Sequence, residues 1–279
     1  MRTEWTVPAG RAALAAEAEG RGALVIGLHA GVCDRRMWRP LAEILKASCR
    51  LVAYDRRGFG ETPAVDERRS QVDDLWAVMG HPAAGSPAIL LGCSQGARIA
   101  IDAALQRPER VKALVLVAPA VSGAPPPELP ESVQALVDAA DEAEKTGEVV
   151  RLNALQAHLW LDGPLSAEGR VGGPLRQLFL TMNRIALNAP PLPSMSEPPS
   201  AWERLSDIRA PVLVLWGDLD FPHIKARCER LVEMLPRARA QLIKGTAHLP
   251  TLEQPEPCAA AIHAFIEEVG PISRADHRN

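Results

Sequence analysis

One pentapeptide of this chain, Gly92-Cys93-Ser94-Gln95-Gly96, has the residue types and spacing of a nucleophile site. The apolar run 88–91 before it predicts a buried strand, and residues 97–105 after it predict a helix. Between a strand and a helix, Gly-x-Ser-x-Gly forms a turn so tight that the serine hydroxyl is exposed. Glycines are needed there because larger side chains would collide where the helix crosses the strand. The pattern predicts nucleophilic chemistry at Ser94.

A serine hydroxyl becomes a useful nucleophile when a base removes its proton, and an imidazole does this best when a carboxylate orients it. Two residues downstream of Ser94 follow predicted strands, namely Asp220 in Gly217-Asp218-Leu219-Asp220 and His248 in Gly245-Thr246-Ala247-His248. We therefore predict a catalytic triad of Ser94, Asp220 and His248. Asp218 is the rival acid, and a hydrogen bond to the loop backbone is its alternative role.

Three other histidines have structural interpretations beside functional ones. His29 ends the first core strand, where packing with hydrogen bonds to the loop backbone is the alternative to proton transfer. His223 enters a predicted helix, which favours an exposed or helix-capping role. His158 either lines a pocket or lies on the surface of a helical insertion. Residues 119–127 contain no Asp or Glu, which excludes an acid after the preceding strand.

The rest of the chain supplies the elements that must position these side chains. Apolar runs of strand length alternate with helical patterns, which indicates a mostly parallel sheet with helices on both faces. Residues 1–22 are expected to form an antiparallel hairpin at the edge of this sheet. We expect core strands at 24–28, 50–54, 88–91, 113–117, 212–216 and 240–243, and helices at 37–48, 67–79, 95–105, 224–235 and 256–269.

Residues 121–208 interrupt this alternation. They are bounded by proline runs and have helical patterns at 133–145, 150–160 and 175–187, without a strand pattern. An all-helical insertion between parallel strands predicts a cap, or lid, over the carboxyl edge of the sheet, where open α/β sheets bind ligands. A separate helical domain is the alternative. We therefore divide the chain into an α/β core of residues 1–120 and 209–279 and a helical cap of residues 121–208.

Composition and charge exclude several classes of partner. The chain has 279 residues, is 47% hydrophobic and 23% charged, and carries a net charge of −3, so we expect neither nucleic acid nor a membrane as partner. Its longest apolar stretch, residues 113–121, is too short to span a bilayer, and the N-terminus lacks a signal core. Five cysteines without metal-binding spacing indicate free buried thiols, no metal site and a cytoplasmic location. The oligomeric state is left open.

Five ordered motifs resemble those of the α/β-hydrolase fold superfamily over nearly the whole chain. They are Leu28-His29-Ala30-Gly31, the segment from Asp55 to Thr62, Gly92 to Gly96, Gly217 to Asp220, and the segment from His248 to Pro255. Within the superfamily, the residues from His29 to Trp38 and the closing His-Leu-Pro-x-Leu-Glu-x-Pro most resemble enol-lactonases and esterases. The resemblance implies a serine hydrolase with an eight-stranded sheet and an inserted helical cap.

The resemblance also implies an oxyanion hole made by the backbone N–H groups of Gly31 and Gln95. The family usually has His-Gly where this chain has His29-Ala30, and alanine has less backbone freedom than glycine, which puts the shape of this loop in question. The Gln95 side chain either points into the pocket or begins the helix. Asp55, Arg56 and Arg57 are expected to pin the neighbouring loop rather than take part in the chemistry. Five apolar residues are candidates for the substrate pocket, with core packing as the alternative for each: Trp160, Phe179, Met182, Phe221 and Leu249.

A serine at the elbow supports acyl transfer, whereas relatives that open epoxides or cleave carbon–halogen bonds use aspartate there. We predict hydrolysis of a small carboxylic ester or lactone, a small-molecule partner, through an acyl-serine intermediate and without a cofactor. One alternative is a carbon–carbon bond hydrolase or a cofactor-free haloperoxidase-like enzyme on the same triad. The other is a non-catalytic hydrolase-like binding protein.

Overall fold

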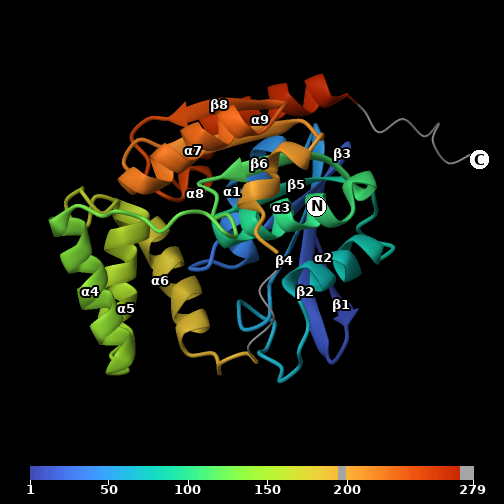
Figure 1. Ribbon diagram of the computed structural model, residues 1–279. Coiled ribbons are helices and arrows are strands. Elements are labelled where there is room, and N and C mark those ends of the chain that lie inside the picture. The colour runs from blue at the N-terminus through green and yellow to red at the C-terminus, as the bar shows by residue number, and fades with distance from the viewer. Residues whose placement is uncertain (194–198, 271–279) are drawn as a thin grey trace, which may run out of the picture.

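The computed structural model describes residues 1–193 and 199–270. At the centre of this part lies an 8-stranded sheet with the strand order β1-β2-β4-β3-β5-β6-β7-β8 (Figure 1). β1 pairs antiparallel with β2, β2 pairs antiparallel with β4, and the other neighbours are parallel. The strands are β1 (Thr3–Ala9), β2 (Ala12–Gly20), β3 (Ala23–Leu28), β4 (Cys49–Tyr54), β5 (Ala88–Cys93), β6 (Val111–Val117), β7 (Val212–Gly217) and β8 (Ala238–Ile243).

Helices cover both faces of this sheet, because its central strands are apolar on both sides. Every residue of β5 and β7 is buried, as expected of parallel strands between two helical layers. One core joins the sheet to α1 (Arg39–Leu45) and α9 (Pro255–Val269). The other joins it to α2 (Gln71–Gly80), α3 (Gln95–Gln106) and α7 (Pro222–Met234). The predicted fold class is confirmed, and so is the edge hairpin.

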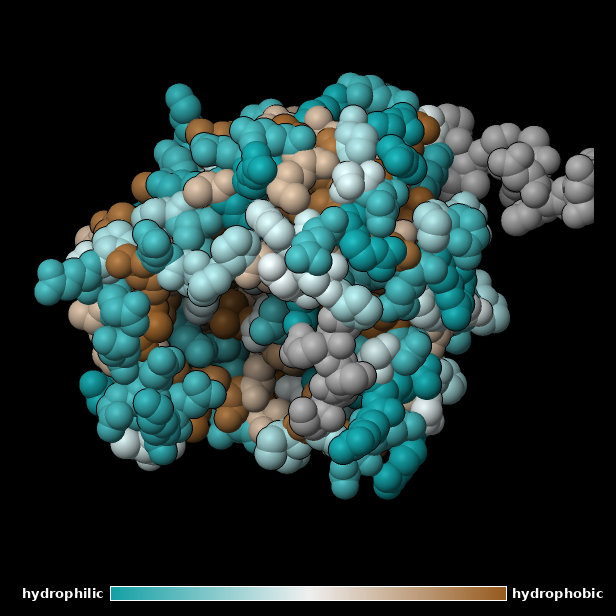
Figure 2. All heavy atoms as spheres, in the orientation of Figure 1, coloured by the Kyte–Doolittle hydropathy of each residue, from teal (hydrophilic) through white to brown (hydrophobic). Residues whose placement is uncertain are grey.

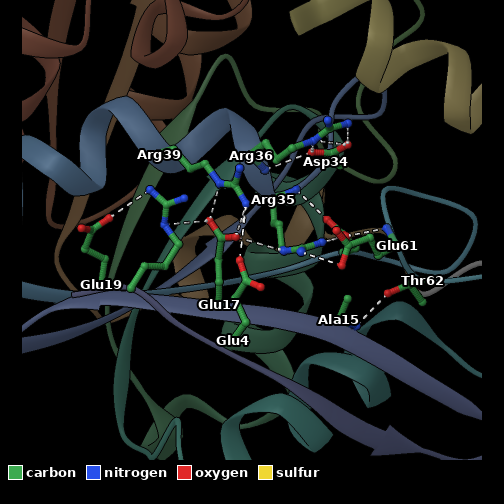
Figure 3. Close-up of polar contacts among 12 residues, drawn as sticks. Glu4, Ala15, Glu17, Glu19, Asp34, Arg35, Arg36, Arg39, Glu61 and Thr62 are labelled. Atoms are coloured by element: carbon green, nitrogen blue, oxygen red, sulfur yellow. Dashed lines mark hydrogen bonds and ion pairs between the residues drawn. The ribbon is translucent and has the colours of Figure 1, made fainter.

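A buried ionic cluster ties the edge hairpin to the loops at the carboxyl edge of the sheet. The Glu17 carboxylate of β2 accepts hydrogen bonds from Arg35 Nε at 3.2 Å and from Arg39 Nη2 at 2.7 Å (Figure 3). The guanidinium of Arg35 also binds the carboxylate of Asp55, which directly follows β4. The Arg35 backbone N–H donates to the same carboxylate at 2.7 Å. The loops after β3 and β4 are thus held together by charge pairs.

Between β6 and β7, the described residues form helices and no strand. These elements are α4 (Glu131–Lys145), α5 (Val149–Ala157), a π-helical turn (His158–Asp162), α6 (Gly173–Leu187) and a 3-10 turn (Trp202–Asp207). Helices α4, α5 and α6 lie together to one side of the sheet (Figure 1). The three helices predicted within 121–208 are therefore present.

The π-helical turn is a difference from the sequence-based expectation of one helix over 150–160. It is followed by Gly163, whose φ is 96°. A Cβ at Gly163 would lie 2.4 Å from the carbonyl oxygen of Leu219, so only glycine allows the helical segment to approach the β7–α7 loop this closely.

All cysteines of the chain are buried free thiols, which confirms the interpretation of their number and spacing: Cys33, Cys49, Cys93, Cys228 and Cys258. Burial raises the pKa of the Cys93 thiol well above its ordinary value. In residues 1–193 and 199–270, no helix combines the length and the apolar character needed to cross a membrane.

Candidate active site

The turn between β5 and α3 has the strained geometry that its sequence predicts. Ser94 has φ 52° and ψ −114°, a conformation that residues other than glycine rarely adopt. A Cβ at Gly92 would lie 2.5 Å from the backbone nitrogen of Ala97, and one at Gly96 would lie 2.1 Å from the carbonyl oxygen of Leu28. The two glycines are therefore required for the helix to start directly against the strands.

The loops after β7 and β8 bring an acid and an imidazole together. His248 Nδ1 lies 2.9 Å from Asp220 Oδ2, and both side chains are buried. Because a carboxylate accepts, Nδ1 carries the proton and Nε2 is left as the basic nitrogen. The rival acid Asp218 instead accepts a hydrogen bond from the Gly245 backbone N–H at 2.6 Å.

The other ring nitrogen of His248 is buried. His248 Nε2 has no hydrogen-bond partner in the described part of the chain, so no hydrogen bond to Ser94 Oγ is present. The His248 backbone does reach the elbow, since its carbonyl oxygen accepts from Cys93 Sγ at 3.8 Å. A movement of one of the two side chains is therefore needed to join the serine to the base.

Two backbone N–H groups at the elbow are available to a ligand. The N–H groups of Gly31 and Gln95 donate to no atom among the described residues. For Gln95 this follows from its position, because the first N–H groups of a helix lack intrahelical acceptors and carry the positive end of the helix dipole. Gly31 follows β3 in the adjacent loop.

His29 fixes the shape of that loop and is not positioned for proton transfer. Its Nδ1 donates to the Ala30 carbonyl oxygen at 2.8 Å, and its Nε2 accepts from the Arg56 backbone N–H at 3.0 Å. Complete burial lowers the pKa of His29 well below its ordinary value, so the ring is neutral. The interpretation of His29 as a packed residue bonded to loop backbone is confirmed.

The Gln95 side chain lies at the site rather than only beginning the helix. Its Oε1 accepts a hydrogen bond from Arg56 Nη1 at 3.1 Å. A Cβ at Gly31 would lie 2.8 Å from Gln95 Cδ, so the amide group packs over the Gly31 backbone. The sequence predicts that Arg56 pins the loop but does not predict this contact, because Gln95 lies 39 residues away in the chain.

The candidate pocket residues fall into two groups. The Trp160 ring lies 4.6 Å from the His248 ring and 4.7 Å from the Phe221 ring, measured between centroids. Phe179, Met182 and Leu249 are fully buried within the core on the α1–α9 side of the sheet. Trp160 is thus the aromatic neighbour of the imidazole, Phe221 packs against Trp160, and the other three pack within the core.

A second contact between the helical segment and the histidine loop was not predicted. Arg170 Nη2 donates to Glu253 Oε2 of α8 (Pro250–Glu253) at 2.5 Å, and Arg170 Nη1 donates to the Gly245 carbonyl oxygen at 3.1 Å. The other carboxylate oxygen of Glu253 accepts from the Ala247 backbone N–H at 2.8 Å. Burial raises the pKa of Glu253 although Arg170 opposes the shift. These hydrogen bonds attach the loop that carries His248 to the helical segment.

Two further histidines, His223 and His158, make contacts outside the Asp220–His248 pair. His223 is half-buried in the first turn of α7, with its ring edge against Phe221, which corrects the expectation of an exposed or capping residue. Burial lowers the pKa of His223 to about 4. His158 Nε2 lies 2.9 Å from the Ser166 carbonyl oxygen, within the helical segment.

The surface next to helices α4–α6 is hollowed. Figure 2 shows a depression between the helices α4–α6 and the rest of the molecule, with hydrophobic side chains at its edge. A cleft also lies between the loop after β4 and the end of α6, lined among others by Gly58, Thr62, Ile185 and Pro190. A small molecule therefore has space next to the helical segment.

Comparisons with known proteins identify the family of the chain. A family model described as the alpha/beta hydrolase family matches residues 25–261. A Bacillus subtilis (strain 168) protein named "Putative 2-succinyl-6-hydroxy-2,4-cyclohexadiene-1-carboxylate synthase" is 30% identical over 93% of this chain and 96% of its own length. A pimeloyl-[acyl-carrier protein] methyl ester esterase of Aromatoleum aromaticum is 27% identical over 86% of this chain and 96% of its own.

A solved structure shows the same fold. The esterase from Rhodococcus sp. ECU1013 is similar with a TM-score of 0.75 and 24% identity, over 96% of this chain and 99% of its own. The match of the family model covers most of the chain, including the elbow and the loops that carry Asp220 and His248. This chain therefore belongs to the alpha/beta hydrolase family and is an enzyme of that family.

Proposed function

We propose that this enzyme is a serine hydrolase that cleaves a small carboxylic ester or lactone through an acyl-enzyme intermediate, with Ser94, His248 and Asp220 as its triad. The observation that carries the proposal is the 2.9 Å hydrogen bond from His248 to Asp220, beside an elbow whose serine has φ 52°. An exposed serine and an imidazole oriented by a carboxylate are the parts that acyl transfer needs. The relatives named methyl ester esterases support the same class of reaction.

The reaction begins when Ser94 Oγ attacks the substrate carbonyl carbon and His248 Nε2 takes the hydroxyl proton. The backbone N–H groups of Gly31 and Gln95 donate to the resulting oxyanion, and one such donor is typically worth about 3–4 kcal/mol of transition-state stabilisation. Collapse of the intermediate breaks the acyl–oxygen bond, and His248 returns the proton to the leaving alcohol. Water then attacks the acyl-serine, with His248 again as the base, and releases the acid.

The unpartnered Nε2 of His248 supports its role as this base. A buried polar atom without a hydrogen bond costs about 1–3 kcal/mol, so a ligand or a moving side chain that satisfies it is favoured. Catalytic hydrogen bonds are often long in free enzymes and close when substrate binds. Asp220 keeps the proton on Nδ1 and stabilises the imidazolium that forms.

We also propose that residues 121–208 act as a cap over this site, on a core made of residues 1–120 and 209–279. The contacts of Trp160 with the His248 ring and of Arg170 with Gly245 and Glu253 support this arrangement. In this proposal Trp160 and Phe221 meet the substrate. Phe179, Met182 and Leu249 support them from the core.

The test is turnover of p-nitrophenyl butyrate by the Ser94→Ala protein, with labelling by a fluorophosphonate probe as the second measurement. We expect a loss of kcat by a factor on the order of 10³ or more and no labelling, because the nucleophile is gone. Ser132→Ala, at an exposed position of α4, is the matched control and keeps both signals. Unchanged turnover or labelling in the Ser94→Ala protein refutes the proposal.

A second candidate is the reaction named for the Bacillus subtilis relative, the formation of a 2-succinyl-6-hydroxy-2,4-cyclohexadiene-1-carboxylate. It is favoured by 30% identity over 93% of this chain. Product analysis separates the two candidates, since one gives an acid and an alcohol and the other gives the cyclohexadiene carboxylate. Assays with a diketone and with peroxide and halide test the remaining chemistries of this triad. Absence of fluorophosphonate labelling in the wild type would favour a binding protein.

A further inference from the structure

One buried cation beside the elbow lacks a carboxylate partner. Arg56 is 3% exposed, and in the described part of the chain no Asp or Glu forms an ion pair with it. Glu67 and Asp74 line the same small cavity as Arg56, but their carboxylates pair with Arg57 and Arg69. Arginine is almost never fully buried unless it is paired, and an isolated buried charge costs several kcal/mol. The position of Arg56 therefore needs an explanation.

The groups that accept hydrogen bonds from the Arg56 guanidinium are neutral, and the charged group that acts on its pKa is another cation, Arg98. Its Nη1 donates to Gln95 Oε1 at 3.1 Å, and its Nη2 donates to the Ala30 carbonyl oxygen at 3.1 Å. Its Cζ lies 4.5 Å from the centroid of the Phe59 ring, and its Nε is buried without a hydrogen-bond partner. Burial lowers the pKa of Arg56 to about 10, so the group is still charged at neutral pH.

Gln95 connects this cation to the reaction centre. Because Arg56 holds Oε1, the other amide atom, Nε2, faces away from the guanidinium, and it donates to no atom among the described residues. The amide packs over Gly31, and Gln95 is exposed. The side chain thus contacts both Arg56 and Gly31, whose backbone N–H is one of the two groups assigned to the oxyanion hole.

We propose that Gln95 and Arg56 form a subsite for a carboxylate on the acyl part of the substrate, so that the preferred substrates are monoesters of dicarboxylic acids or lactones that carry a free carboxylate. The proposal rests on the proposed ester hydrolysis and names its substrate class. The Gln95 amide N–H donates to the substrate carboxylate, and Arg56 behind it supplies the opposite charge. A bound carboxylate neutralises the cation that the protein leaves unpaired.

The experiment compares kcat/KM for monoethyl glutarate and ethyl pentanoate, which have acyl chains of the same length and differ in the terminal carboxylate. We expect the wild type to prefer the monoester by about tenfold or more, which corresponds to about 1.4 kcal/mol. Arg56→Met removes the charge, and Gln95→Glu supplies an internal carboxylate to Arg56, so the ratio falls to about one in both. Arg36→Met, which removes a cation already paired with Asp34, keeps the preference. Equal values for the two esters in the wild type overturn the subsite and leave ester hydrolysis standing.

A binding measurement separates this proposal from the proposed function. Calorimetric titration of glutarate into the Ser94→Ala protein needs no turnover. We expect binding that weakens about tenfold or more when Arg56→Met or Gln95→Glu is added. If neither ester is hydrolysed, the proposed function fails, but Arg56-dependent glutarate binding still supports the subsite. Absence of glutarate binding, or binding that ignores both substitutions, overturns it. If Arg56→Met does not fold, Gln95→Glu decides the question alone, because it adds a partner for the buried cation.

Discussion

Asp218 and Asp220 lie two residues apart in one loop, yet each carboxylate has its own task. Asp220 accepts from the imidazole of His248 at 2.9 Å, whereas Asp218 accepts from the backbone of Gly245 at 2.6 Å. We expect Asp220→Asn to lower kcat by roughly 10³–10⁴-fold, because an amide can donate to Nδ1 and thereby stabilise the wrong tautomer of the imidazole. The measurement is kcat on p-nitrophenyl butyrate together with thermal unfolding.

Asp218→Asn is the matched control for this prediction, since it makes the same chemical change in the same loop. Its lost charge weakens one backbone contact, so unfolding free energy falls by about 1–2 kcal/mol while kcat stays near the wild-type value. The assignment of the two carboxylates is contradicted when Asp218→Asn, and not Asp220→Asn, loses the activity.

Single residues differ in how far the sequence predicts them. Ser94 could be predicted because its neighbours on both sides, a buried strand and a helix, encode the turn locally. The partners of Arg56 and Arg57 could not be predicted, since they come from elsewhere in the chain. Arg57 meets Asp74 at 2.8 Å, whereas Arg56 meets a glutamine 39 residues away. The identity of a charged residue's partner is a property of the fold and not of the local pattern.

Among the elements, the loop between α5 and α6 does more than connect two helices. Arg170 in this loop binds Glu253 at 2.5 Å and the carbonyl oxygens of Gly245 and Leu161. We expect Arg170→Met to leave the buried Glu253 carboxylate with only a backbone donor and to lower the unfolding free energy by about 1–3 kcal/mol. Because the same carboxylate holds the loop of His248, kcat/KM falls as well. Chemical unfolding and ester hydrolysis measure the two effects.

The double variant Arg170→Met with Glu253→Gln tests the cause of that loss. A neutral amide at residue 253 tolerates burial better than an unpaired carboxylate, so part of the stability returns, and the two substitutions are not additive. Arg184→Met, at an exposed position of α6, is the control and leaves both quantities near wild type. Full additivity of the effects of the two substitutions on unfolding free energy would contradict an energetic coupling between Arg170 and Glu253.

The elements themselves were largely predictable, for a physical reason. Parallel strands covered on both faces are continuous apolar runs, so β5 and β7 stand out in the sequence. The π-helical turn at His158–Asp162 did not, and the residue that follows it, Gly163, packs against the carbonyl oxygen of Leu219, far along the chain. The ends of some helices differ from the expected ones because of local capping hydrogen bonds. The helix expected over 67–79 begins at Gln71, where the Ser70 hydroxyl accepts from the Asp73 backbone N–H.

At the scale of the whole molecule, buried carboxylates and buried histidines have opposite effects on how stability changes with pH. Burial raises the pKa of Asp55 to about 6 and also raises the pKa of Glu253, whereas it lowers the pKa of His29 and takes that of His223 to about 4. A carboxylate whose pKa is raised by folding stabilises the folded state as pH falls. A histidine whose pKa is lowered by folding destabilises the folded state as pH falls. The net stability profile therefore mixes both signs, and the contribution of one residue is best isolated by a variant.

His29→Gln isolates the histidine contribution. The unfolded chain binds a proton at this residue below pH about 6.5, whereas the folded protein keeps the buried ring neutral, so His29 favours the native state above that pH and loses this advantage as pH falls. We expect the wild type to exceed His29→Gln in unfolding free energy at pH 7.5, and this difference to shrink by about 1 kcal/mol at pH 5.5, because glutamine does not titrate. Urea unfolding of both proteins at the two pH values measures it, and Asp55 and Glu253 cancel because both proteins contain them. Ser132→Ala, at an exposed position of α4, is the control whose difference from the wild type stays constant, because neither side chain titrates. A difference for His29→Gln that does not change with pH would mean that the ring takes up its proton over the same pH range in the folded and the unfolded chain, and the hydrogen bond from Arg56 to its Nε2 would then have to be abandoned.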